Sequence, residues 1–190
     1  MKQNYFIRFL ILAFVLLMTM TACALKKDNN LSVDYLLEYS IEIEKGIFSP
    51  KQVAFDMTID EVLKAKSLGT EAVSEDDKLG KRIIQTVDIV GLSDKMTIIY
   101  WFHEDKLTTV EYILAASDRE KATVCNSLYE QAKKQLPTPS VNSLEDVKKG
   151  KNTVTWWDKE QNSISISYPT TADSESNIIS VSISMAKESK

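Results

Sequence analysis

Residues 96–114 read MTIIYWFHEDKLTTVEYIL, and this stretch decides the fold. The runs 96–103 and 106–114 are both rich in β-branched and aromatic residues, which is typical of strands. The charged segment HEDK at 103–106 supplies turn residues between them. We therefore predict an antiparallel hairpin at the centre of the chain.

Further strand-like runs lie on both sides of this hairpin. One precedes it at 82–91, so the first half contains a meander of three strands, and the second half has runs at 153–158, 163–168 and 178–185. In the last two runs isoleucine and other apolar residues alternate with serine. Because strand residues alternate between the two faces of a sheet, the seryl face is predicted to be the wet one.

Two helices are predicted beside these strands. Thr58 and Glu61 have capping-box spacing, and the helix that they begin is expected to run through Leu68. A longer helix is expected over 117–135, where apolar residues recur at helical spacing before Pro137.

The segments before and after the first helix are less regular. Alternation of apolar residues with glutamate and serine predicts a half-buried strand over 37–43, ended by Lys45-Gly46. The acidic segment 70–81 has little periodicity and is interpreted as a solvated loop.

An internal repeat is suggested by setting 95–112 beside 151–168. Five positions are then identical, among them Trp101 with Trp157 and Tyr112 with Tyr168. The fold class is therefore predicted to be α+β, with two tandem repeats of a helix and a three-stranded antiparallel meander, and with the helices packed on one sheet face.

A family resemblance follows from these motifs. The order of helix and meander, the FDMTIDEV segment at 55–62 and the FHEDKL hairpin at 102–107 resemble the tandem repeats of the β-lactamase inhibitor protein-like fold, which small bacterial outer-membrane assembly lipoproteins also use. The similarity covers about residues 54–185. Asp56 is a departure, since glycine is frequent there in the family. The resemblance implies a fold and no catalytic residue.

The N-terminal residues have the order of a secretory signal peptide. A basic start is followed by ten apolar residues at 9–18, about half of the 20 or so that a membrane-crossing helix needs. The following Met-Thr-Ala-Cys at 20–23 resembles a bacterial lipobox, although leucine is usual where Met20 stands. This resemblance implies lipid on Cys23, with acyl chains such as palmitate as the membrane anchor.

The resulting organisation has four parts. We expect a lipoprotein signal peptide at 1–22, a lipidated tether at 23–33, an N-terminal strand with the first repeat at 34–114, and the second repeat at 115–190. Ala24 after Cys23 is not the aspartate that retains lipoproteins in an inner membrane. We therefore expect a chain anchored to a cell membrane on its extracytoplasmic side, in an envelope of one membrane or two.

Charge and composition exclude several classes of function. Loss of Lys2 and Arg8 with the signal peptide leaves 21 basic and 27 acidic side chains, a balance of −6. Nucleic-acid binding is not expected, because it needs a basic surface. The chain has one histidine and no nucleophile motif, phosphate loop or metal-ligand cluster, so we predict no enzyme, no metal and no cofactor. The alternative is a hydrolase whose catalytic carboxylates come together from distant positions in the sequence.

Alternation places two tryptophans on the polar face, where exposed aromatics could bind a partner. The predicted contact residues are Trp101, Trp157, Ile99, His103 and Thr155. The alternative is that the indole rings cover a seam or a loop. The leading hypothesis is a protein-binding or scaffolding module of the cell envelope; the others are an inhibitor of a secreted or periplasmic hydrolase and a structural envelope lipoprotein without a tight partner.

Overall fold

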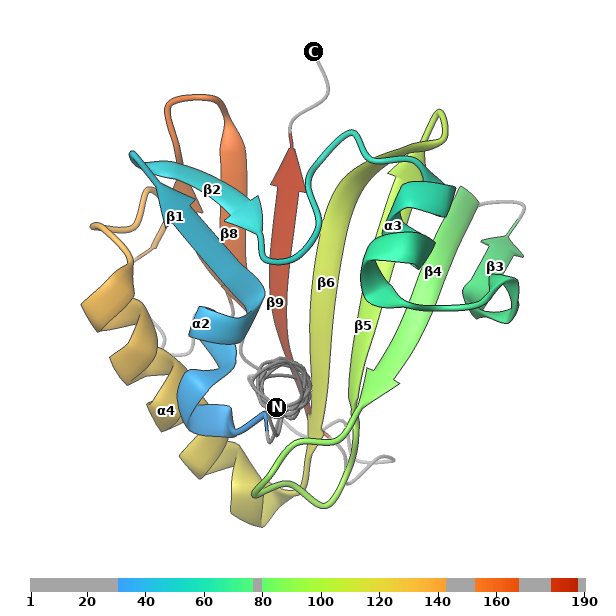
Figure 1. Cartoon of the computed structure of the whole chain (residues 1–190). Helices are drawn as coiled ribbons and strands as arrows, with labels where there is room; N and C mark the ends of the chain where they lie inside the picture. Colours follow the sequence, from blue (N-terminus) through green and yellow to red (C-terminus); the bar gives the residue numbers. More distant parts are fainter. Residues whose placement is uncertain (1–30, 77–79, 143–152, 168–178, 188–190) are drawn as a thin grey trace, which may run out of the picture. The chain divides into compact units, whose positions relative to one another are not determined.

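A computed structural model describes residues 31–76, 80–142, 153–167 and 179–187. They are α+β, with antiparallel sheets of two and seven strands (Figure 1). In chain order the elements are η1 (Val33–Tyr35), α2 (Leu36–Ser40), β1 (Ile41–Glu44), β2 (Ile47–Pro50), α3 (Ile59–Lys66), η2 (Thr70–Ala72), β3 (Val73–Asp76), β4 (Gly80–Val87), β5 (Met96–His103), β6 (Lys106–Ala116), α4 (Asp118–Gln135), β7 (Thr153–Trp157), β8 (Asn162–Ser167) and β9 (Ile179–Lys187).

The large sheet has the strand order β3-β4-β5-β6-β9-β8-β7. The two predicted meanders, β4–β6 and β7–β9, therefore meet along β6 and β9, the last strand of each. The predicted central hairpin is confirmed: Glu104 and Asp105 both have positive φ, 49° and 60°, as a two-residue turn between twisted strands requires.

The core lies on one face of this sheet. A row of directly paired residues crosses six strands, and each member is at most 1% exposed. This covered row consists of Ile83, Tyr100, Val110, Met185, Ile164 and Trp156. Burial of such large apolar side chains supplies most of the favourable free energy of folding.

The cover over this face comes from the described helices and the β1–β2 hairpin (Figure 1). Helix α4 contacts β6 and β9, and β2 contacts β8 and β9. Gln131, itself 7% exposed, joins the cover together, since its side chain accepts from the Leu37 amide at 2.9 Å and donates to the Val33 carbonyl at 2.7 Å.

The helix starts follow the sequence prediction. Thr58 and Glu61 form the capping box of α3, and Ser117 and Glu120 form that of α4. Asp56, at the position where the resembling family favours glycine, has φ of 68°. That left-handed conformation is easiest for glycine and is tolerated by aspartate, which accounts for both residues.

The predicted strand over 37–43 is wrong in its first half, because α2 occupies Leu36–Ser40 and β1 begins only at Ile41. Leu36 and Leu37 are adjacent and both fully buried. In a half-buried strand, adjacent side chains point to opposite faces, so only one of the two would be buried. Packing on α4 therefore overrides the alternating pattern. The predicted loop at 70–81 is also wrong, because η2, β3 and the start of β4 lie within it, and β3 is held by its pairing with β4.

Candidate functional site

The opposite face of the large sheet carries the predicted contact residues. A second row of paired residues crosses the same six strands, and each of its members is next in sequence to a member of the covered row. This open row consists of Arg82, Trp101, Thr109, Ala186, Ser163 and Trp157. Most of its members are half-buried or exposed, and Ser163 is buried.

Trp101 and Trp157 lie in this one row, but their places in the sheet are not equivalent. Trp101 is on the internal strand β5, and Trp157 is on β7 at the end of the strand order. The alignment of 95–112 with 151–168 therefore pairs the second strand of one meander with the first strand of the other. The prediction that Trp101 and Trp157 occupy equivalent positions in two repeats is wrong. Four strand spacings of about 4.8 Å place the two backbones roughly 19 Å apart.

Trp101 is held between two charged side chains. The guanidinium carbon of Arg82 is 5.3 Å from the centroid of the indole ring, within the range of a cation–π interaction. On the other side the indole Nε1 donates to Glu111 Oε2 at 3.4 Å. This ring is therefore fixed in orientation, whereas Trp157 is 41% exposed.

Ile99 is half-buried in the middle of the open face, where it pairs with Ile84 on one side and Glu111 on the other. Together with Trp101 these isoleucines give the β4–β6 part of the face an apolar surface. The β7–β9 part is different, because hydroxyl groups cover it.

Thr155 belongs to this hydroxyl part. Its Oγ1 lies 2.9 Å from Ser165 Oγ, and Thr153 Oγ1 lies 3.1 Å from Ser167 Oγ. The predicted alternation of 163–167 is confirmed, since Ile164 and Ile166 are fully buried and the serines lie on the other face. The prediction that the seryl face is wet is only partly met, because Ser163 is buried and Ser165 and Ser167 are half-buried.

His103 is exposed at the end of β5, paired with Lys106 across the hairpin turn. It lies at the margin of the open face rather than among the residues of the open row. The structure therefore brings four of the five predicted contact residues onto one face of the sheet and leaves His103 at its margin.

The outer edge of β7 is occupied by residues 140–142 of the same chain. The Thr155 amide donates to the Val141 carbonyl at 3.1 Å, and the Thr155 carbonyl accepts from the Ser140 and Val141 amides. The Trp157 amide donates to Ser140 Oγ, and Asn142 Nδ2 donates to the Thr153 carbonyl. A partner at this end of the sheet must therefore approach the open face and not the edge.

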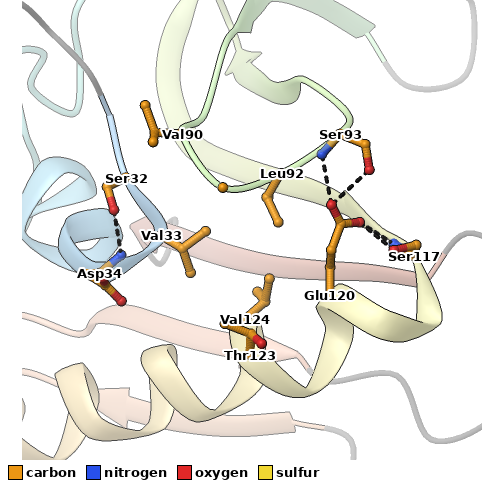
Figure 2. Close-up of a pocket in the computed structure, with 11 residues that line it drawn as sticks. Ser32, Val33, Asp34, Val90, Leu92, Ser93, Ser117, Glu120, Thr123 and Val124 are labelled. Atoms are coloured by element: carbon orange, nitrogen blue, oxygen red, sulfur yellow. Dashed lines mark hydrogen bonds between the residues drawn. The ribbon is translucent and has the colours of Figure 1, made fainter.

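A cavity of about 570 Å³ lies elsewhere, between η1, the β4–β5 loop and the start of α4 (Figure 2). Val33, Leu92 and Val124 form its apolar wall, and Glu120 lies at its rim. Both oxygens of the Glu120 carboxylate accept hydrogen bonds, from Ser93 on one side and Ser117 on the other. These bonds lower the pKa of Glu120 to about 2. The carboxylate thus serves to fasten the loop to the helix.

Asp158 is a buried carboxylate that sequence reasoning did not single out, and it is 8% exposed. Its oxygens accept from the amides of Phe48, Glu160 and Asn162 and from Asn162 Nδ2, at 2.7 to 2.9 Å. Burial raises the pKa of Asp158, but these hydrogen bonds lower it by more, so that the pKa lies below its ordinary value. The Phe48 bond fastens the β1–β2 hairpin to the β7–β8 turn.

Among the described residues no three histidine, cysteine or acidic side chains are grouped as metal ligands. In the same part of the chain, no helix combines the length and the apolar character needed to cross a membrane. The predicted signal peptide and Cys23 lie outside the described residues. Comparison with family profiles, with curated proteins and with solved structures found no match.

Proposed function

We propose that this chain is a lipid-anchored, extracytoplasmic lipoprotein that binds another protein of the cell envelope through the open face of its sheet. One observation carries the proposal: two tryptophans and a half-buried isoleucine lie on a sheet face that the described helices leave uncovered. Tryptophan provides a large contact area at low entropic cost, and it is enriched at the centres of interfaces.

The proposed localisation depends on residues 1–30. Lipidation of Cys23 would make the membrane the first partner of the chain. The described residues begin at Leu31, so eight residues after Cys23 would span at most about 28 Å. The face would then be displayed close to the membrane surface. The acidic balance supports a protein partner over nucleic acid.

The proposal extends to the finer fold. The order β4-β5-β6-β9-β8-β7 is compatible with two helix-and-meander repeats whose last strands meet. In this arrangement β4, β5 and β6 correspond to β7, β8 and β9, and not to the strands that the sequence alignment paired. A β-lactamase inhibitor protein-like repeat would have this form.

The test is photocrosslinking in intact cells with the full-length chain. A photoreactive residue replaces Thr155, which lies on the open face, or Tyr35, which is 63% exposed on η1 among the elements of the cover. We expect a specific protein to be captured from position 155 and not from position 35. We expect Trp157→Ala to reduce that capture about thirtyfold, because hot-spot tryptophans contribute about 2 kcal/mol or more.

The outcomes separate the candidate functions. A captured non-enzymatic envelope protein supports the scaffold, and a captured hydrolase whose activity falls on binding identifies an inhibitor. Equal capture from positions 155 and 35, or capture unaffected by Trp157→Ala, contradicts the role of the open face. No capture from either position favours a structural lipoprotein without a tight partner.

A further inference from the structure

Arg82, the arginine of the open row, differs from Lys81, its neighbour on β4, in its charged partners. Lys81 pairs with Asp105 at 2.8 Å, and Lys95 pairs with Asp88 at 3.1 Å. Arg82 has no carboxylate within ion-pair distance among residues 31–76, 80–142, 153–167 and 179–187. Its Nε is buried and meets no hydrogen-bond acceptor in the same residues. Within those residues, no carboxylate therefore compensates the charge of Arg82.

The nearest acid of the open face does not supply the missing partner. Glu111 lies on β6, two strands from Arg82, and its carboxylate contacts the Trp101 indole instead. Trp101 stands on the strand between them. Each charge interacts with the ring, and neither neutralises the other.

The position of Arg82 prepares it for a ligand. Stacking on the Trp101 ring restricts the guanidinium, so that less side-chain freedom is lost when it binds. A planar guanidinium matches a carboxylate, to which it can donate two parallel hydrogen bonds. A half-buried cation that pairs with no carboxylate of the described residues therefore favours an acidic group of a partner.

The surroundings of Arg82 define what should flank that acid. Ile84 is two residues along β4 on the same face, and its direct neighbour on β5 is Ile99. Both are half-buried, so an apolar surface adjoins the cation. A partner would cover these isoleucines with an apolar side chain while its carboxylate meets Arg82.

We infer that Arg82 is the charged anchor of the open face and that the protein partner presents an aspartate or glutamate beside an apolar residue. This inference rests on the proposed function and names the chemistry of its partner. Charge complementarity supports it: the anchor carries a positive charge that the described residues leave unpaired, and a partner carboxylate would pair with it.

The test extends the photocrosslinking experiment in intact cells. A photoreactive residue replaces Ile84, and the captured protein and its crosslinked peptide are identified by mass spectrometry. Arg82→Gln is compared with Arg82→Lys and with the matched control Lys81→Gln on the same strand. Thermal unfolding of each variant confirms that it folds. We expect Arg82→Gln to reduce capture about tenfold, as loss of a charge-assisted hydrogen bond does. We expect Arg82→Lys to recover part of the capture and Lys81→Gln to have no effect.

A charge exchange gives the decisive readout. Arg82→Glu should abolish capture, and replacement of the partner's acidic residue by lysine should restore it. A crosslinked peptide without aspartate or glutamate, or a folded Arg82→Gln variant with full capture, would overturn the inference. If that full capture still depends on Trp157, the proposed protein-binding function stands without this anchor. If position 155 captures nothing, the proposed function itself fails.

Discussion

The covered row and the open row are built on the same six strands, one residue apart, yet they serve different ends. The covered row ends in Trp156 and the open row in Trp157, so one peptide bond separates a fully buried indole from one that is 41% exposed. The Trp156 indole donates to the Pro137 carbonyl at 2.9 Å and is enclosed by the core. Residue type alone therefore does not distinguish a core tryptophan from a contact tryptophan.

The difference between the rows arises from what lies over them. The covered row belongs to the buried core that the helices and the β1–β2 hairpin help to enclose, whereas on the open row Arg82 stacks on Trp101, its neighbour in the row. Substitutions on the covered row should therefore change stability. Substitutions on the open row should chiefly change binding.

The largest effect is expected at the end of the two rows. Trp156→Ala should lower the free energy of unfolding by about 3–5 kcal/mol, because it leaves a large cavity in the core. Trp157→Ala should change it by about 0.5 kcal/mol or less, as for most surface positions. Urea unfolding followed by circular dichroism measures both. Comparable losses from the two variants would mean that the open face is covered after all.

A second pair compares adjacent residues in the middle of the sheet. Ile98→Thr should cost about 2–3 kcal/mol, because a hydroxyl replaces an ethyl group at a fully buried position. Ile99→Thr should cost about 1 kcal/mol or less, since Ile99 is half-buried and threonine also favours strands. The midpoints of urea unfolding give the difference. An Ile99→Thr loss as large as that of Ile98→Thr would contradict the distinction between the faces.

The next prediction concerns Asp158, whose hydrogen bond with Phe48 fastens the β1–β2 hairpin of the cover. Asp158→Asn should cost about 1–3 kcal/mol at neutral pH, because buried amide donors lose acceptors. The folded-state pKa is lowered, so the ionised carboxylate stabilises the fold above the ordinary aspartate pKa, and this contribution is lost as pH falls through the folded-state pKa. The stability difference between wild type and Asp158→Asn should therefore shrink in acid.

The control for this prediction is Glu160→Gln, which changes an exposed acid in the same turn. Its stability difference from wild type should be small at every pH. A wild-type advantage over Asp158→Asn that persisted unchanged at low pH would show that charge is not the basis of the effect.

The smallest loss in the free energy of unfolding is expected where η1, α2 and α4 meet. Gln131→Ala should cost about 1–2 kcal/mol, because the Leu37 amide and the Val33 carbonyl lose their buried partners. Gln135→Ala, on an exposed site of the same helix, is the control. Hydrogen exchange at Leu37 reports the site directly. Unchanged protection in Gln131→Ala would show that this bond does not hold the cover.

The alternation of 96–114 and of 163–167 was enough to predict most strands and the two faces. It was enough because a hydrophobic pattern with a period of two specifies which side of a sheet is buried. The same pattern misled over 37–43, where the burial of both Leu36 and Leu37 against α4 decides the structure. Local sequence does not show which distant element supplies the cover.

The contacts missed by sequence reasoning join positions far apart in the chain. Asp158 and Phe48 are separated by 110 residues, and Gln131 and Val33 by 98. The five proposed contact residues were found by alternation alone, but the unpaired state of Arg82 depends on which acids surround it in the fold. The sequence similarity of 95–112 to 151–168 was misleading in the same way, because the strands that it pairs occupy different places in the sheet.

The closed edge at β7 has a consequence for assembly. An open strand edge presents unpaired amides and carbonyls, which can recruit a strand from another molecule and start edge-to-edge aggregation. Here Ser140, Val141 and Asn142 occupy the outward groups of Thr153, Thr155 and Trp157. Copies of the chain at high local concentration are therefore not expected to polymerise through that end of the sheet.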